Sequence, residues 1–366
     1  MIRGLSWRHF DFWLLGAVVL ATAFGIAMIR SSVAGNEGLI PLINRQILFA
    51  SIGLGVIVLI GAIDYHFWLA LYRPIYVVMM ALLVLLLLSA QAVFGAERWF
   101  RVGQIFIQPT ELAKIVVILM LARYFGAAVD APRDLRWVLF SLAWMMGLTI
   151  WILLQPNLSN VIVISFIWIA MTWISGLQLK HLLVFGVAGI VAAIAGFPLL
   201  QPYQQQRIIN FLFPDPTARH GATYNVRQAL IAIGSGGLLG KGYGHGTQVQ
   251  LRFLKVRHTD FIFSATAEEF GMVGALLVVA VLIFIIGRCL RAARMARDLS
   301  GTLIAYGVAV LIFFQAAVNI SVNLNLIPVS GLPLPFISYG GSGLLSLMLG
   351  IGLVESVLMH HKVLEF

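Results

Sequence analysis

Long apolar runs constrain the fold of this chain more than any other feature of its sequence. A helix needs about 20 mostly apolar residues to cross the ~30 Å hydrocarbon core of a bilayer, and such runs recur along the whole chain. Hydrophobic residues fill 61% of the 366 positions and charged residues only 10%, which leaves too little polar surface for a water-soluble fold. The sequence therefore predicts one all-α integral membrane domain, residues 1–366, with ten transmembrane helices. Their predicted ranges are 12–30, 46–63, 75–95, 111–128, 137–155, 159–177, 181–200, 262–287, 302–324 and 340–360.

Two of these assignments depend on local signals. Residues 137–177 form nearly one apolar block, interrupted only at Gln155-Pro156-Asn157, so a tight helical hairpin is expected there. Basic residues precede the first apolar run, as they do in a signal peptide. That run lacks a cleavage site and is followed by further spans, so a retained first helix is expected. Cys289 is the only cysteine, which excludes an intramolecular disulfide.

The distribution of lysine and arginine predicts the orientation of the chain in the membrane. With a cytoplasmic N-terminus, twelve of the 24 basic residues fall on the cytoplasmic side, whereas the short outer loops hold only Arg30, Arg45, Arg98 and Arg101, as the positive-inside rule requires of short loops. Both termini are then cytoplasmic, and residues 201–261 form a long extracytoplasmic loop between spans 7 and 8. The net charge of +10 is mainly a topology signal, and the cluster from Arg288 to Arg297 indicates contact with anionic lipid rather than nucleic acid. The basic residues predicted on the cytoplasmic side are Arg3, Arg8, Arg73, Arg133, Arg136, Lys180, Arg288, Arg291, Arg294, Arg297 and Lys362, with Arg123 near that face.

The long loop leads into the most polar part of the chain. Loops of this length are usually functional or disordered. Two apolar, helix-compatible stretches, 207–213 and 224–233, favour a folded loop that lies along the membrane surface. Residues 231–270 are polar and rich in glycine, between long apolar runs. Because ionisable residues in a membrane chain mark functional sites, this stretch is predicted to hold an active site that faces outward.

Six blocks of sequence resemble the signature blocks of the SEDS family, the RodA and FtsW glycosyltransferases. They occur in the expected order, and the match runs from the first span to the last. The string GKGYGHGTQ and the overall length are more similar to RodA, the cell-elongation member, than to FtsW, the division member. The six blocks are GAERWFRVGQIFIQPTELAKI (95–115), QQQRIINFLFPDP (204–216), QALIAIGSGGLLGKGYGHGTQ (228–248), HTDFIF (258–263), AEEFGMVG (267–274) and PVSGLPLPFISYGGSG (328–343).

The resemblance implies an inverting glycosyltransferase of the bacterial inner membrane. Its substrate would be lipid II, the undecaprenyl-pyrophosphate-linked disaccharide pentapeptide, which is polymerised into β-1,4-linked peptidoglycan on the outer face. A class B penicillin-binding protein would be its transpeptidase partner. Two other functions stay open, a lipid II flippase and a non-catalytic scaffold for that partner. A flippase would be expected to show an inverted repeat with paired broken helices, which the sequence lacks.

The reaction that the resemblance implies needs a base and a set of groups that accept a departing pyrophosphate. Asp260 is the predicted base, because partial desolvation at the start of an apolar helix would raise the pKa of its carboxyl group. The resemblance implies the same role, with His258 and Thr259 in support. The alternative is that Asp260 caps the helix that follows it.

Several basic residues are candidates for binding the pyrophosphate. Glu111 and Lys114 share one face of a helix near its outer end. They form either part of this site or an internal ion pair that fixes helix packing. Arg98 and Arg101 lie just upstream, in a short outer loop where arginine is not expected from the topology.

Arg207 and Lys241 are further phosphate candidates. The glycine run that begins at Gly234 lacks the spacing of a nucleotide-binding loop. Its glycines permit either tight turns or close approach of the backbone to a sugar or lipid headgroup. These two interpretations stay open.

Four other residues are predicted to support the site. Glu268 and Glu269 lie about 100° apart on a helix, so they should face different partners, at least one of them inside the bundle. Ser338 and Tyr339 follow a proline- and glycine-rich segment that either lines the cavity below Asp260 or forms a structural kink.

Metal binding cannot be assigned from the sequence. A divalent cation, Mg²⁺ or Mn²⁺, that bridges a pyrophosphate is compatible with the implied chemistry. His245 and His258 have no neighbours at the spacing of metal ligands, however, so the metal ligands stay unknown.

The chain also departs from the family pattern at three places. Asn157 stands where members usually carry an aspartate, and it keeps the shape of aspartate but not the charge. The other departures are Lys255-Val256-Arg257 in place of a Pro-Glu pair and Ser321-Val322-Asn323 in place of an NIGM-like run. If the carboxylate at the first position normally binds a cation or positions a base, the chain has either compensated for its loss or become less active, whereas the other two departures are expected to affect contacts with substrate or partner.

Overall fold

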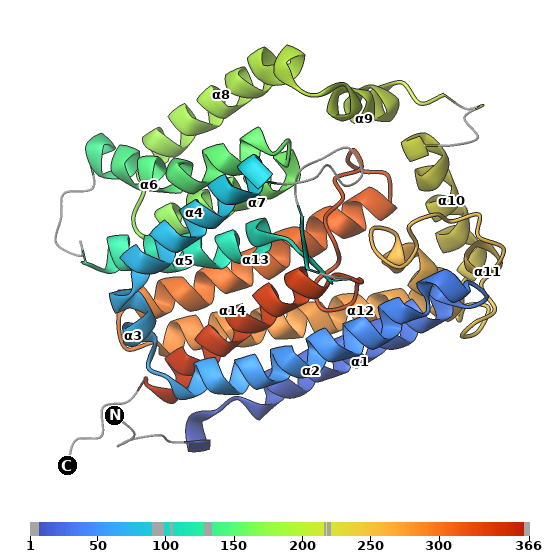
Figure 1. The fold of residues 1–366 in the computed structure, drawn as a ribbon, viewed down its shortest axis with the longest axis horizontal. Coiled ribbons are helices and arrows are strands. Elements are labelled where there is room, and N and C mark those ends of the chain that lie inside the picture. Colours follow the sequence, from blue (N-terminus) through green and yellow to red (C-terminus); the bar gives the residue numbers. More distant parts are fainter. Residues whose placement is uncertain are drawn as a thin grey trace.

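The structure is a computed structural model that describes residues 7–89, 99–102, 105–127, 134–215, 217 and 221–361. Almost all regular structure among these residues is helical (Figure 1). The helices that bear on the site are α1 (Phe12–Val33), α2 (Pro41–Ala62), α3 (Tyr65–Ala70), α4 (Tyr72–Ser89), α5 (Pro109–Ala127), α6 (Leu135–Leu154), α7 (Leu158–Ile174), α8 (Leu179–Gly196), α9 (Pro202–Leu212), α10 (Gly221–Gly236), α11 (Thr247–Gln250), α12 (Ile262–Met295), α13 (Leu299–Asn323) and α14 (Gly341–Met359).

The all-α prediction is confirmed, with one small addition. Two three-residue strands, β1 (Phe100–Val102) and β2 (Ile105–Ile107), pair antiparallel ahead of α5. Three short 3-10 turns complete the described regular structure, η1 (Trp7–His9), η2 (Glu37–Leu39) and η3 (Phe197–Leu199).

Each of the ten predicted spans overlaps one long helix. Seven of the described helices, α1, α2, α6, α8, α12, α13 and α14, are long and apolar enough to cross a membrane. Two others, α4 and α7, are apolar but shorter, and α5 carries Glu111, Lys114 and Arg123. The count of ten spans therefore stays a prediction.

The predicted break between spans 5 and 6 is confirmed. The α6 helix ends at Leu154 and α7 begins at Leu158, so Gln155, Pro156 and Asn157 form the turn. Proline cannot supply a backbone N–H to continue the helical hydrogen bonds. The eighth predicted span was too short, because α12 continues to Met295 through the arginines of its last turns.

The core is built around α13 and α14. The α14 helix packs along α2, and α13 packs against α5 and α12. Close approach of α14 to α2 depends on Gly352, because a Cβ atom there would lie 2.9 Å from Cβ of Ile60. Small residues at such crossings allow helices to pack closely within a membrane. The α8 helix, by contrast, has an apolar surface that is exposed along its length, and it lies at the edge of the bundle (Figure 1).

The predicted loop 201–261 is folded over its described residues. It contains α9, α10 and α11, and the first two cover the stretches expected to be helical. The α10 helix packs against the first turns of α12. Gly236 makes this contact possible, because a Cβ atom there would lie 1.9 Å from the carbonyl oxygen of Ala267.

The first and last helices meet at one end of the bundle. The backbone N–H of Asp11 donates a hydrogen bond to Glu355 of α14 over 2.9 Å. Arg288, near the end of α12, donates to the Asp11 carboxylate over 2.7 Å. Asp260, which precedes α12, is 28 residues from Arg288, or about 40 Å at 1.5 Å per helical residue. Both ends of the described chain therefore lie at the end of the bundle opposite to Asp260.

Candidate active site

Asp260 lies in the turn before α12, and its backbone is fixed by α13. Its carbonyl oxygen accepts hydrogen bonds from the side-chain amides of Asn319 over 3.0 Å and Asn323 over 2.9 Å. These two asparagines are four residues apart, so they share one face of α13. The position of Asp260 is therefore set by contacts to its main chain that do not involve its carboxylate.

The alternative role for Asp260, a helix cap, is not what the structure shows. The N-cap residue of α12 is Phe261, and its side chain makes no capping hydrogen bond. The side-chain oxygen of Asn323 instead accepts from the backbone N–H of Ser264 over 3.0 Å and from its hydroxyl group over 2.6 Å. An asparagine on α13 thus satisfies a free amide of the first turn of α12.

The surroundings of Asp260 favour its protonated form more than water does. Burial raises the pKa of its carboxyl group to about 6, while the positive charge of Arg207 and a hydrogen bond from Thr259 act in the opposite direction. A carboxylate in this range is mostly ionised at neutral pH and is more basic than an exposed one. Burial also lowers the pKa of the neighbouring His258, with Arg257 adding to the effect.

The segment before α14 lies directly beside Asp260. The hydroxyl group of Ser338 donates to the carbonyl oxygen of Thr259 over 2.7 Å. The backbone N–H of Tyr339 donates to the carbonyl oxygen of His258 over 2.9 Å. The structure thus brings together five of the predicted residues, Asp260 with His258, Thr259, Ser338 and Tyr339.

An apolar cleft of about 440 Å³ lies between α7, α9, α13 and the segment before α14. Among the described residues that line it, Arg207 of α9 is the only charged one. Its guanidinium group donates to the carbonyl oxygen of Ser330 over 3.5 Å. This arginine therefore connects the cleft to the environment of Asp260. The cleft is lined by Pro156, Leu158, Ser159, Ile162, Tyr203, Gln204, Arg207, Ile208, Phe314, Val318, Ile327, Pro328, Val329, Ser330 and Leu332.

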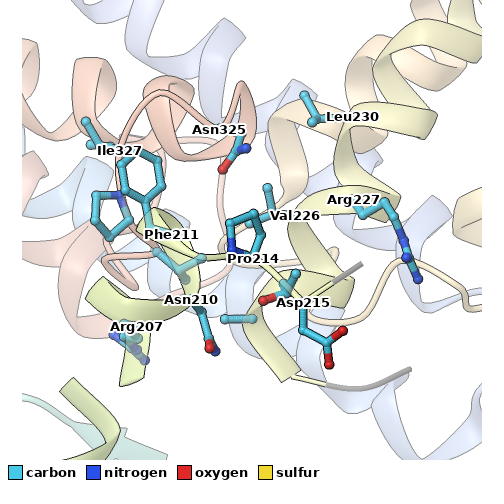
Figure 2. Close-up of a pocket in the computed structure, with 14 residues that line it drawn as sticks. Arg207, Asn210, Phe211, Pro214, Asp215, Val226, Arg227, Leu230, Asn325 and Ile327 are labelled. Carbon is cyan, nitrogen blue, oxygen red and sulfur yellow. The ribbon is translucent and has the colours of Figure 1, made fainter. Parts of the chain in front are cut away.

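A more polar pocket of about 250 Å³ adjoins this cleft between α9 and α10. The two share Arg207 and the segment 327–329. Figure 2 shows Arg207 and Arg227 on opposite sides of the pocket, with Asn325 beside it. The two cavities thus meet at Arg207.

Glu111 and Lys114 form an ion pair inside the bundle. The ammonium group of Lys114 donates to the Glu111 carboxylate over 2.7 Å, and only 1% of the lysine side chain is exposed. The prediction that Glu111 and Lys114 share one face of a helix is confirmed. A direct role in binding pyrophosphate stays a prediction, because the pair is already complete without a ligand.

Asn157 lies near this ion pair. Its side-chain amide donates to the hydroxyl oxygen of Thr110 over 3.4 Å, and Asn160 donates to the same atom over 3.2 Å. Thr110 precedes Glu111 on α5. Asn157 therefore contributes a hydrogen-bond donor here, which an aspartate could not do.

Lys241 and Glu268 belong to a different part of the polar stretch. The Glu268 carboxylate accepts from the Lys241 ammonium group over 2.8 Å and from the hydroxyl group of Thr247 over 3.1 Å. It also accepts from the backbone N–H groups of Gln248 over 2.9 Å and Val249 over 3.2 Å. Lys241 is thus engaged within the protein, and its predicted contact with phosphate has no direct support.

The glycine run that begins at Gly234 takes part in the same contact, between the loop 201–261 and α12. Gly240 has a φ of +80°, and a Cβ atom there would lie 2.2 Å from the carbonyl oxygen of Glu269. This favours the interpretation that the glycines permit tight turns. Glu269 receives a hydrogen bond from the Ser31 hydroxyl group, so Glu268 and Glu269 face different partners as expected. Both are buried.

Two of the predicted arginines cannot be placed. Arg98 lies outside the described residues, and for Arg101 the structure describes only the backbone, within β1. Among the described residues, no group of three or more histidine, cysteine, aspartate or glutamate side chains could hold a metal ion.

Sequence reasoning missed the asparagines that fix Asp260. Asn319 and Asn323 are buried polar residues four positions apart in a mostly apolar helix, a pattern that marks the interior of a membrane bundle. That spacing could have identified them, but Asn323 was noted only as a departure from the family pattern.

Comparison with known proteins gives a consistent result over the whole chain. The family model for FtsW, RodA and SpoVE, described as cell cycle proteins, matches residues 4–363. The peptidoglycan glycosyltransferase MrdB of Escherichia coli is 37% identical over 361 residues, which cover 98% of this chain and 95% of MrdB. A probable peptidoglycan glycosyltransferase FtsW of Hydrogenovibrio crunogenus is 34% identical, over 95% of this chain and 91% of that protein.

Solved structures share the same fold. A chain from a peptidoglycan synthase complex, solved to study the structural coordination of polymerization and crosslinking, aligns with a TM-score of 0.83 at 29% identity, over 97% of this chain and 99% of that one. The rod shape determining protein RodA of Thermus thermophilus aligns with a TM-score of 0.72 at 29% identity, over 96% and 97%. The resemblance seen in the sequence blocks is confirmed, and the chain belongs to the FtsW/RodA/SpoVE family of cell cycle proteins.

Proposed function

We propose that this protein is a peptidoglycan glycosyltransferase that polymerises lipid II into β-1,4-linked glycan strands during cell elongation. The observation that carries the proposal is the carboxyl group of Asp260, whose pKa is raised to about 6 and which interacts with the positive charge of Arg207, a residue that lines an apolar cleft. Relatives over nearly the full length are named peptidoglycan glycosyltransferases. A base, a cation and an apolar cleft are what transfer between lipid-linked sugars needs.

In the proposed reaction, Asp260 removes a proton from the acceptor sugar. The 4-hydroxyl oxygen of the acceptor forms a bond to the anomeric carbon of the donor sugar, while Asp260 takes the hydroxyl proton. The bond between that carbon and the pyrophosphate oxygen breaks, and the leaving pyrophosphate keeps the electron pair. Attack from the opposite face inverts the configuration, so an α-linked lipid pyrophosphate yields a β-linked glycan.

Arg207 has the chemistry and the location to bind the leaving group. A guanidinium group forms two parallel hydrogen bonds to phosphate oxygens. Its place between the apolar cleft and the less apolar pocket beside it suits a molecule with a prenyl chain at one end and sugars at the other. In the proposal, the cleft takes part of the prenyl chain and Arg207 takes the pyrophosphate.

A divalent cation, Mg²⁺ or Mn²⁺, enters no step of this mechanism. The described residues provide no group of three potential ligands, so they do not fit a metal held by the protein alone. A cation carried on the pyrophosphate would need few protein ligands, and we propose this as the form in which one would bind.

The proposal extends to location and partner. Both ends of the described chain lie at the end of the bundle that carries Arg288 and Arg291, and the positive-inside rule assigns that end to the cytoplasm. Asp260 would then face the outer side of the bacterial inner membrane. One structural relative is a chain of a peptidoglycan synthase complex, which supports a class B penicillin-binding protein as the partner.

Purified protein incubated with fluorescent lipid II separates the three candidate functions. Long glycan strands on a gel, formed without the partner or only with it, support the enzyme. Movement of lipid II across a vesicle membrane without polymer would indicate a flippase. Neither product, with or without the partner, would indicate a scaffold and would overturn the proposal.

A further inference from the structure

A second charged cavity lies at the opposite end of the bundle, where the described chain begins and ends. Its volume is about 430 Å³, and its walls come from the start of α1, the last turns of α12 and the end of α14. Three arginines and two histidines line it, Arg8, His9, Arg288, Arg291 and His361. The proposed reaction at Asp260 uses none of these residues.

The positive charge of this cavity is only partly neutralised. Among the residues that the structure describes, Asp11 is the only acidic one in its lining. Its carboxylate is already bound to Arg288 over 2.7 Å and caps the first turn of α1. Arg8 and Arg291 are exposed, and within the described part of the chain neither has a carboxylate partner. Two positive charges therefore remain for a ligand.

The rim of the cavity has the character of a membrane interface. Trp13 and Phe12 of α1 are 73% and 65% exposed, and both line the cavity. Tryptophan at the end of a transmembrane helix typically lies at the level of the lipid headgroups. Met295 at the end of α12 adds a further exposed apolar side chain. Cations and lipid-facing aromatic rings thus share one cavity.

We propose that this cavity binds one anionic phospholipid of the leaflet on that side of the membrane. Its phosphate group would lie between Arg8 and Arg291, and its acyl chains would run past Phe12 and Trp13. Basic pockets at this depth attract anionic headgroups, and arginine binds phosphate oxygens through two hydrogen bonds. The proposal is independent of the reaction assigned to Asp260.

Native mass spectrometry of the full-length protein tests this site. The protein is released from detergent in the presence of phosphatidylglycerol or of phosphatidylcholine with the same acyl chains. We expect one phosphatidylglycerol to be retained in preference to phosphatidylcholine. The double substitution Arg8→Gln/Arg291→Gln should lower its retention by roughly tenfold or more, because each basic residue near an anionic surface contributes about 1 kcal/mol.

A matched control removes the same charge outside the cavity. Arg294→Gln/Arg297→Gln changes two exposed arginines that lie at the same end of α12 but outside the lining, and it should change retention less than about twofold. Equal losses in both double variants would overturn the proposal, as would equal retention of the two lipids. Displacement of the lipid by millimolar inorganic phosphate would instead indicate a free-anion site. If the first double variant does not fold, Arg291→Gln alone is measured against Arg294→Gln.

Discussion

Asp260 and Glu268 are eight residues apart in one polar stretch, but their carboxylates have different surroundings. Glu268 is fully buried and accepts hydrogen bonds from a lysine, a threonine and two backbone amides. Asp260 is held through its backbone carbonyl oxygen instead, and Thr259 and Arg207 are the polar groups that act on its carboxyl group. The first arrangement joins a loop to a helix, whereas the second leaves a carboxylate available for reaction. Proximity in the sequence therefore does not imply a shared role.

The largest effect is expected from removing the Glu268 carboxylate, which accepts hydrogen bonds from other groups of the protein. Glu268→Ala would leave the Lys241 ammonium group and two backbone N–H groups without their acceptor, and breaking a buried pair costs about 3–5 kcal/mol. We expect a clear fall in the melting temperature in detergent. Glu37→Ala removes an exposed carboxylate and serves as the control. An unchanged melting temperature for Glu268→Ala would contradict the structural role.

Removing the positive charge of Arg207, which acts on Asp260, should affect substrate binding rather than the stability of the fold. Arg207→Gln would remove a charge-assisted contact worth about 1.5–3 kcal/mol, which corresponds to a KM for lipid II that is roughly 10–100-fold higher. The melting temperature should stay the same, as should the KM of Arg30→Gln, which changes an exposed arginine of α1. A normal KM for Arg207→Gln would remove this residue from the proposed site.

The pH dependence of polymerisation should report Asp260. Its pKa is raised to about 6, and the base must be ionised to accept a proton. The rate should therefore be constant above about pH 7 and fall roughly tenfold per pH unit below about pH 6. A rate that stays flat from pH 7 to pH 4.5 would argue against Asp260 as the base.

The smallest effect is expected at Asn157. The Thr110 hydroxyl group accepts a hydrogen bond from Asn157 over 3.4 Å, and in Asn157→Asp it can rotate to donate one instead. We therefore expect a stability change below about 1 kcal/mol and polymer yields within roughly threefold of wild type, with or without the partner. A change of more than tenfold in yield would show that the missing charge matters for catalysis.

The sequence was sufficient for most of the fold because membrane helices depend on local composition. Apolar runs located the long helices, and Pro156 located the turn between α6 and α7. The end of α12 was placed eight residues too early because arginines in its last turns were counted as loop. Arginine side chains can reach the headgroup region from within a helix, so charge alone does not end one.

The candidate site was less predictable, because its parts come from distant segments. The pairing of Lys241 with Glu268 spans 27 residues, and the Asn323 contact to Asp260 spans 63. No local sequence pattern reveals which of several carboxylates accepts hydrogen bonds from such distant segments. Asp260 was identified from its motif, whereas its distinction from Glu268 required the three-dimensional arrangement.

Polymerisation of lipid II by Asp260→Asn, measured beside the wild-type protein, tests the central claim most directly. The two preparations should give the same melting curve, because the carboxylate of Asp260 caps no helix. We predict that the variant loses about 10²–10⁴-fold in rate, the usual contribution of a general base, while Glu37→Gln keeps the full rate. A folded Asp260→Asn protein that polymerises lipid II at the wild-type rate would contradict this claim.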